Sequence, residues 1–361
     1  MENFDKIIND ALEKAVKERG HINILIAGRS GVGKSTLINS VFQSKLAETG
    51  QGRPVTQNTR EINKEGIPLT IFDTRGLEMN DFESTLSELE KVIEDRCNDR
   101  DPNRHIHLAW LCIQEDGRRV EDAEIRLHEM VSKRVPLIGV VTKARSDQGF
   151  KQKAQSLLPQ TKNVIRVRAI TEYFDEEEGL PPIPPMGLKE LIEISSEVVP
   201  EGKRKALAAA QKADLDYNKS QARKIVIGAS SAAAAAGASP IPMSDVAILA
   251  PIQVGMIAGI TSVFGIELSK ATLSTLVSSA IGVTGVSFAG RAIVSNILKC
   301  IPGVGSVAGG AISATTASAL TVALGEAYIA VLVAIFADDP DAKPDAVEIG
   351  ERLKEKMKHA K

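Results

Sequence analysis

An eight-residue loop constrains this chain more than any other feature of its 361 residues. It consists of Gly28, Arg29, Ser30, Gly31, Val32, Gly33, Lys34 and Ser35, with Thr36 directly after it. The loop matches G-x-x-x-x-G-K-[ST], follows the apolar run Ile22–Ala27 and opens a helix-forming segment, which is the context that this pattern requires. Its glycines let backbone N–H groups turn inward on phosphate oxygens, and the following helix adds the positive end of its dipole. We therefore predict a nucleoside triphosphate site, with Lys34 on the β- and γ-phosphates and Ser35 on Mg²⁺.

Apolar strands alternate with polar helices over the first 200 residues. The predicted strands are Ile22–Ala27, Glu61–Lys64, Leu69–Asp73, Ile106–Ile113, Leu137–Thr142 and Val164–Val167. The predicted helices lie at about 34–44, 82–97, 120–133, 148–157 and 187–198. This alternation predicts an α/β fold with a doubly wound, mostly parallel sheet.

After about Pro200 the composition changes. Gly202–Lys224 is charged and alanine-rich and predicts a long connecting helix, whereas Ile225–Ala337 is apolar and dominated by Gly, Ala, Ser, Val and Ile. We therefore predict a nucleotide-binding domain at residues 21–200 and an apolar all-α domain, ending in a polar tail helix, at 201–361. Residues 1–20 form an amphipathic N-terminal helix, expected to pack on the domain that follows.

A second motif, Asp73-Thr-Arg-Gly76, stands at the end of a predicted strand. A carboxylate there can hold Mg²⁺, usually through water, and Gly76 can offer its N–H to the γ-phosphate. Thr56 and Thr59 lie between this motif and the phosphate loop. Either threonine can complete the Mg²⁺ shell only while the γ-phosphate is present, which makes their loop a switch. We favour Thr56, because the remaining spacing leaves room for a strand before Asp73.

Thr142-Lys143-Ala144-Arg145 follows another predicted strand. Together with the phosphate loop, this run resembles the Era-like and septin-like P-loop GTPases, in which [NT]-K-x-D recognises guanine. The resemblance implies GTP or GDP as ligand, with the stem of Lys143 over the base and Ala169 in the last base-contacting loop. Arg145 stands where that group has aspartate, and the next aspartate is Asp147; immunity-related GTPases are similar here, with a Thr-Lys-x-x-Ser-Asp run. This departure leaves an ATP-using P-loop enzyme as an alternative.

The helical half resembles the domain of unknown function 697, which accompanies some bacterial Era-like GTPases. The residues that carry this resemblance are Pro240–Asp245, Gln253–Ile257, Ser262–Gly265 and Ile301–Gly310. Its uncharged runs are long enough for membrane spans, but they lack flanking aromatic belts and basic clusters. A buried helical bundle and membrane insertion through residues 225–337 both stay open, and we favour a cytoplasmic protein that is soluble or peripheral at a membrane.

Leu77 occupies the position where many GTPases carry the glutamine that orients the attacking water. We therefore assign catalysis to Lys34, Thr56, Gly76 and Glu78, with Glu78 positioning water. Transition-state charge could be stabilised in cis or across a dimer by Arg75, Arg118 or Arg119. We expect a slow GTPase switch that self-associates through the nucleotide-binding domain, with GTP-driven assembly or membrane remodelling as an alternative.

Other features narrow the choice of partners. The net charge of −2 gives no reason to expect nucleic acid, and no motif names a protein effector. The first residues lack the apolar core of a signal peptide, and the three cysteines lie far apart, as in a reducing cytosol. His105 and His107 alternate on one strand without a third ligand, so we expect no metal site there.

Overall fold

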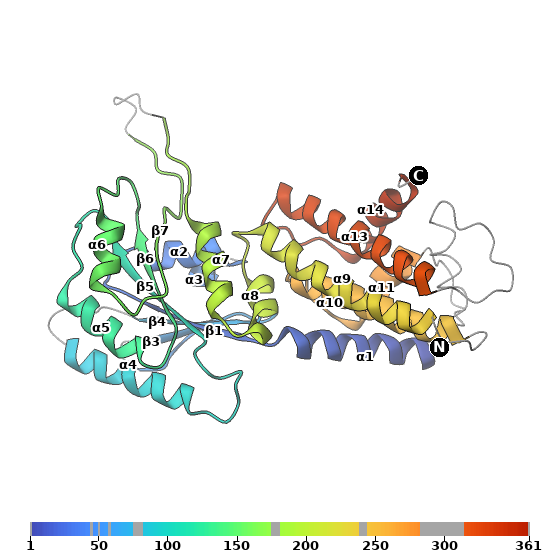
Figure 1. Cartoon of the computed structure of the whole chain (residues 1–361), viewed down its shortest axis with the longest axis horizontal. Coiled ribbons are helices and arrows are strands. Elements are labelled where there is room, and N and C mark those ends of the chain that lie inside the picture. Colours follow the sequence, from blue (N-terminus) through green and yellow to red (C-terminus); the bar gives the residue numbers. More distant parts are fainter. Residues whose placement is uncertain are drawn as a thin grey trace. The chain divides into compact units, whose positions relative to one another are not determined.

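Figure 1 shows the computed structural model of the chain, which describes residues 2–43, 46–49, 51–56, 59–74, 82–174, 181–237, 244–281 and 314–359. Two compact units are present. The α/β unit spans Gly20–Asp214, and the helical unit combines Met1–Arg19 with Leu215–Lys361. We expected the division near residue 200, whereas the structure divides the chain after Asp214 and groups the N-terminal helix with the helical half.

A seven-stranded sheet forms the centre of the α/β unit, among the residues that are described. Its strands are β1 (Ile22–Ala27), β2 (Gln51–Pro54), β3 (Thr59–Asn63), β4 (Leu69–Thr74), β5 (Leu108–Gln114), β6 (Leu137–Thr142) and β7 (Val164–Arg166). They are ordered β2-β3-β4-β1-β5-β6-β7. The strands from β4 to β7 in that order are parallel, and β3 and β2 add an antiparallel edge. The predicted α/β fold with a mostly parallel sheet is confirmed.

Helices cover both faces of this sheet. They are α2 (Lys34–Val41), α3 (Leu46–Thr49), α4 (Phe82–Cys97), α5 (Asp122–Ser132), α6 (Phe150–Leu157), α7 (Leu188–Val198), the 3₁₀ helix η3 (Glu201–Lys203) and α8 (Arg204–Ala210). Apolar residues of α4, α5 and α6 share one core with Leu111 and Val141 of the sheet. Side chains alternate between faces along a strand, so Trp110 points to the opposite face. There it stacks on Phe42, with ring centroids 5.6 Å apart, and donates its indole N–H to Ser195 of α7.

The long connecting helix predicted over Gly202–Lys224 is wrong, because the helical run is interrupted between α8 and α9 (Leu215–Gly237). Two hydrogen bonds lie within the interruption. Gln211 Nε2 donates to the Asp214 carbonyl (2.9 Å), and the Asp214 N–H donates to Gln211 Oε1 (2.8 Å). Side-chain bonds of this kind compete with the helical ladder, and composition alone does not reveal them.

The helical unit consists, within the described residues, of six helices. They are α1 (Glu2–Arg19), α9, α10 (Ser244–Val263), α11 (Lys270–Ile281), α13 (Ala314–Asp338) and α14 (Ala346–His359). α9 packs on α10 and α13, and α1 packs on α10 and α11. Ile8 of α1 is fully buried. We expected α1 to pack on the next domain, and the structure instead makes it part of this helical core.

Small residues allow the close helix packing of this unit. A Cβ on Gly325 of α13 would lie 2.6 Å from Cγ2 of Val226 in α9, so the two helices touch at that point. Tyr328 of α13 and Thr261 of α10 share a buried hydrogen bond of 2.7 Å. The packing therefore combines close backbone approach with a buried polar contact whose partners are matched.

Of the described helices, α13 alone is long and apolar enough to cross a membrane, with a hydropathy of 2.2 in its most apolar stretch. About half of that stretch, 56%, is buried inside the protein. Glu326 within α13 forms an ion pair with Arg223 of α9 at 3.0 Å. Core helices of soluble proteins pass the same length test, so α13 is weak evidence for a membrane. Residues 282–313, which carry part of the other predicted runs, lie outside the described residues.

Candidate functional site

Three glycines give the phosphate loop its backbone form. The angle φ is 147° at Gly28, 75° at Gly31 and 97° at Gly33, all in the region that favours glycine. A Cβ on Gly28 would lie 2.4 Å from the Cys112 carbonyl oxygen, so the loop leaves β1 in close contact with β5. Helix α2 begins directly after Gly33. The loop thus has the strand–turn–helix geometry of a phosphate cradle.

The ammonium group of Lys34 folds back into this loop. Its Nζ donates to the carbonyls of Gly28 (2.7 Å) and Arg29 (2.9 Å), and the side chain is buried. Ser35 and Thr36, which follow it, are exposed. One helix N-terminus therefore presents a cation and two accessible hydroxyl groups, a set that suits phosphate oxygens and a bound Mg²⁺.

Arg29 extends from the loop to helix α5. Its Nε donates to Glu124 Oε1 (3.1 Å), and a terminal nitrogen lies 3.1 Å from Glu121 Oε1. Burial raises the pKa of Glu124, whose side chain also closes the capping box at the start of α5. The predicted ligand contact of Arg29 can thus come from its backbone, since its side chain fastens the loop to α5.

Asp73 lies at the carboxyl end of β4, beside β1. The strand register pairs Asp73 with Ile26, one residue before β1 ends, so the carboxylate is carried beside the start of the phosphate loop. No group of three or more His, Cys, Asp or Glu side chains gathers into a metal site in the described part of the chain. Ser35 and Asp73 fit Mg²⁺ nevertheless, because this ion is usually held by one or two protein ligands and by substrate phosphates.

Thr56 and Thr59 face each other across the turn between β2 and β3. The Thr59 N–H donates to Thr56 Oγ1 (3.0 Å), and the Thr56 N–H donates to the Thr59 carbonyl (3.2 Å). Thr59 is buried at the start of β3, whereas Thr56 is half-buried. The predicted residues Gly76 and Glu78 of the second switch segment lie outside the described residues, as does Arg75.

Thr142 connects the phosphate loop to the end of β6. Its hydroxyl donates to the Val32 carbonyl at 2.6 Å and lies 3.2 Å from the Ile113 carbonyl oxygen. The side chain is buried. One hydroxyl thus holds three backbone segments together: the phosphate loop, the end of β5 and the end of β6.

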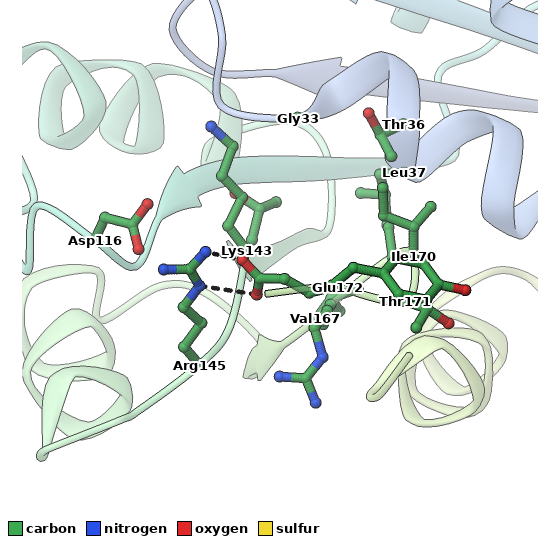
Figure 2. Close-up of a pocket in the computed structure, with 14 residues that line it drawn as sticks. Gly33, Thr36, Leu37, Asp116, Lys143, Arg145, Val167, Ile170, Thr171 and Glu172 are labelled. Carbon is green, nitrogen blue, oxygen red and sulfur yellow. Dashed lines mark hydrogen bonds and ion pairs between the residues drawn. The ribbon is translucent and has the colours of Figure 1, made fainter. Parts of the chain in front are cut away.

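A pocket of about 470 Å³ adjoins the phosphate loop (Figure 2). The predicted ligand-binding residues in its wall are Gly33, Thr36, Thr142, Lys143, Arg145 and Ala169. Lys143 has a φ of 53°, and its Nζ donates to Gln114 Oε1 at 3.4 Å. The structure therefore brings predicted residues from three separate segments of the sequence to one pocket that continues from the phosphate loop.

Arg145 forms an ion pair with Glu172 in the wall of this pocket. Its Nε donates to Glu172 Oε2 at 2.8 Å, and a terminal nitrogen contacts Oε1. Figure 2 shows the two side chains pointing toward each other. The backbone of Glu172 is itself paired with Ile183, which fixes the segment that carries it. Sequence reasoning missed Glu172, although this acid stands only three residues beyond Ala169 in the expected base-contacting loop.

Asp147, the aspartate closest to the motif, serves the local fold. Its carboxylate accepts the N–H of Lys151 at 2.7 Å near the start of α6 and lies 3.6 Å from Arg166. Glu115 behaves similarly, since it accepts the N–H of Ser146 (2.8 Å) and a bond from Arg166 (2.6 Å). Neither residue is in the pocket wall.

Two family models match this chain. Residues 23–143 match the model described as 50S ribosome-binding GTPase, and residues 203–359 match the domain of unknown function 697. The chain carries a P-loop GTPase domain followed by a domain of unknown function 697. Both resemblances inferred from the sequence are confirmed, and the α/β unit is called the GTPase domain from here on.

Septins are among the curated relatives of the GTPase domain. Septin-9 of Rattus norvegicus is 27% identical over an alignment of 208 residues, and the match covers 49% of this chain and 36% of that protein. Neuronal-specific septin-3 of Mus musculus is 26% identical over an alignment of 203 residues, and the match covers 48% of this chain and 57% of that protein. The match thus spans between about a third and somewhat over half of these relatives' length. Among solved structures, a probable GTP-binding protein engB aligns over 48% of this chain and 99% of its own, with 19% identity and a TM-score of 0.31.

The histidines of the GTPase domain have structural hydrogen bonds. His107 Nδ1 accepts the N–H of Asn23 (3.0 Å), and its Nε2 lies 2.9 Å from the Pro102 carbonyl oxygen. Burial lowers the pKa of His107 to about 4. His105 Nε2 bonds to the Asp99 carbonyl. Both rings therefore support the β1–β5 region of the GTPase fold.

Proposed function

We propose that this protein binds GTP with Mg²⁺, hydrolyses it slowly and acts as a nucleotide-dependent switch. The observation that carries the proposal is the continuity of the pocket beside Lys143 with the phosphate loop at Gly33 and Thr36. Thr142 links the two through its hydrogen bond to Val32. A nucleoside triphosphate has the matching form, with a flat base at one end and a phosphate chain at the other.

Each part of the site has an assigned task in hydrolysis. Lys34 and the loop N–H groups hold the phosphates, and Mg²⁺, when bound through Ser35 and Asp73, neutralises the charge that develops on them. Gly76 offers its N–H to the γ-phosphate, and Glu78 positions the attacking water. With Leu77 in place of the usual glutamine, we expect slow turnover in the isolated protein.

The switch centres on Thr56. Its hydroxyl accepts the N–H of Thr59 in the turn between β2 and β3. To join a Mg²⁺ shell, this hydroxyl has to leave the turn, so γ-phosphate binding and the shape of the β2–β3 edge are coupled. Loss of the γ-phosphate returns the hydroxyl to the turn.

Self-association through the GTPase domain is the proposed route to faster turnover, with an arginine such as Arg118 or Arg119 supplied across the dimer. We propose a cytoplasmic protein that is soluble or peripheral at a membrane. The Arg223–Glu326 pair supports this, because it places the charge of Glu326 within α13, the helix long and apolar enough to cross a membrane, and pairs it with α9. GTP-driven assembly on membranes is the second function, and α13 is the feature that favours it.

Calorimetry with GTP, GDP and ATP, each with and without Mg²⁺, tests the proposal directly. We expect tight Mg²⁺-dependent GTP binding, weak ATP binding and no triphosphate binding in Lys34→Ala. Turnover per molecule is then measured over a wide range of protein concentration. Preference for ATP contradicts the assignment of GTP, and fast turnover that is independent of concentration contradicts the switch model. Nucleotide-dependent sedimentation with liposomes, absent with GDP, identifies the assembly function instead.

A further inference from the structure

The pocket of the GTPase domain holds an unusual pair at its base-recognition position. Arg145 stands where the resembling GTPases have a carboxylate, and its guanidinium is bound to the Glu172 carboxylate by two nitrogens. Both residues line the pocket together with Lys143 and Ala169. The side chain of Glu172 remains 24% exposed. A carboxylate is thus present in the pocket, but it comes from the segment after β7.

We propose that Glu172, oriented by Arg145, is the carboxylate that selects guanine, an inference that rests on the proposed GTP binding. A carboxylate has about four lone-pair positions, and the two bonds from Arg145 leave two of them for a ligand. Guanine presents two donors on one edge, N1–H and the 2-amino group. Adenine presents the bare acceptor N1 there, which a carboxylate repels. Arg145 is the positioning residue, because its bidentate pair fixes the direction in which Glu172 points.

Other carboxylates near the pocket have different partners. Glu115 and Asp147 accept backbone N–H groups and bonds from Arg166, and neither lines the pocket. Asp116 does line it, but this carboxylate accepts a hydrogen bond from Gln114 Nε2 at 2.9 Å, whereas Arg145 is paired with Glu172. Asp116 therefore provides a matched control, as a second acid in the same pocket wall.

The test compares Glu172→Gln with the full-length wild type for binding of GTP and xanthosine triphosphate. Xanthine carries a carbonyl in place of the guanine 2-amino group, so the amide nitrogen of glutamine can donate to it. We expect GTP affinity to fall about 100-fold and xanthosine triphosphate affinity to rise, since hydrogen bonds to a charged group are lost with one base and a new bond forms with the other. A gain of binding cannot come from a misfolded protein, and affinity for inorganic triphosphate should stay unchanged.

The control Asp116→Asn should keep the wild-type order of preference. Arg145→Ala should weaken GTP selectivity in the wild type, yet change little when added to Glu172→Gln, because the two residues act through one contact. An inverted preference in Asp116→Asn, or unchanged selectivity in Glu172→Gln, overturns the assignment of Glu172. A wild type that binds ATP as well as GTP refutes the proposed function itself and is recognisable before any variant is made.

Discussion

Replacing Thr142 by valine removes one hydroxyl and keeps the shape of the side chain. In the structure that hydroxyl donates to the buried Val32 carbonyl at 2.6 Å. A buried acceptor left without its partner costs about 1–3 kcal/mol. With about 1.5 kcal/mol and an unfolding entropy of roughly 0.4 kcal/mol/K for a domain of this size, the melting temperature should fall by about 4 °C. Because the same bond holds the phosphate loop in place, up to about 10-fold in GTP affinity should be lost as well.

Tryptophan fluorescence is the assay of choice, since Trp110 is the single tryptophan and lies buried in the GTPase domain. Its thermal transition therefore reports on that domain and not on the helical unit. Thr142→Ser keeps the donor and serves as the matched control, with a smaller loss from its missing methyl group. If Thr142→Val melts and binds GTP like the wild type, the hydroxyl does not hold the loop and the reasoning fails.

Three further predictions concern the local fold. Asp147→Ala should lower the stability of the GTPase domain by about 1 kcal/mol through the lost hydrogen bond from the Lys151 N–H, while calorimetry shows unchanged GTP affinity. A large loss of affinity would identify Asp147 as a base contact. Gly325→Ala should destabilise the helical unit by about 1–3 kcal/mol in urea unfolding, because the new methyl group meets Val226. The control Gly228→Ala has open space around it and should stabilise the unit by up to about 1 kcal/mol. Equal effects of the two substitutions would show that the α9–α13 contact is loose. His107 stays neutral in the folded domain down to about pH 4, because its pKa is lowered to about 4, whereas the unfolded chain binds a proton below about pH 6.5. The free energy of unfolding should therefore fall by about 2 kcal/mol from pH 7 to pH 5. His107→Gln should flatten this pH dependence in unfolding monitored by tryptophan fluorescence.

The sequence predicts the GTPase sheet well because its signals are local. Buried parallel strands are continuous apolar runs, and Ile22–Ala27 and Leu137–Thr142 are found with the predicted bounds. β2 escaped prediction because Gln51–Pro54 has no apolar alternation and becomes a strand only by pairing with β3. The helix interruption at Gln211 and Asp214 was missed for a similar reason, since two side-chain to backbone hydrogen bonds form there.

The phosphate-binding half of the site could also be predicted from the sequence, because one short motif contains both the glycines that shape the loop and the lysine that binds phosphate. The base half was not. The pair of Arg145 and Glu172 joins positions that are far apart along the chain, and no spacing rule predicts it. The hydrogen bond of Asp147 to the first turn of α6 was equally hidden, because an aspartate after a lysine motif suits both a base contact and a helix N-terminus.

The grouping of α1 with residues 215–361 means that the GTPase domain is an insertion within the helical unit. The domain is tethered at both of its ends, at Arg19–Gly20 and at Asp214–Leu215. Residues 1–19 and residues 215–361 are thus joined to opposite ends of the GTPase domain along the chain, and the helical unit is complete only when both parts are present. It follows that cutting the chain at residue 20 or 200 does not release an intact helical unit, since the first cut removes a helix whose Ile8 is fully buried there.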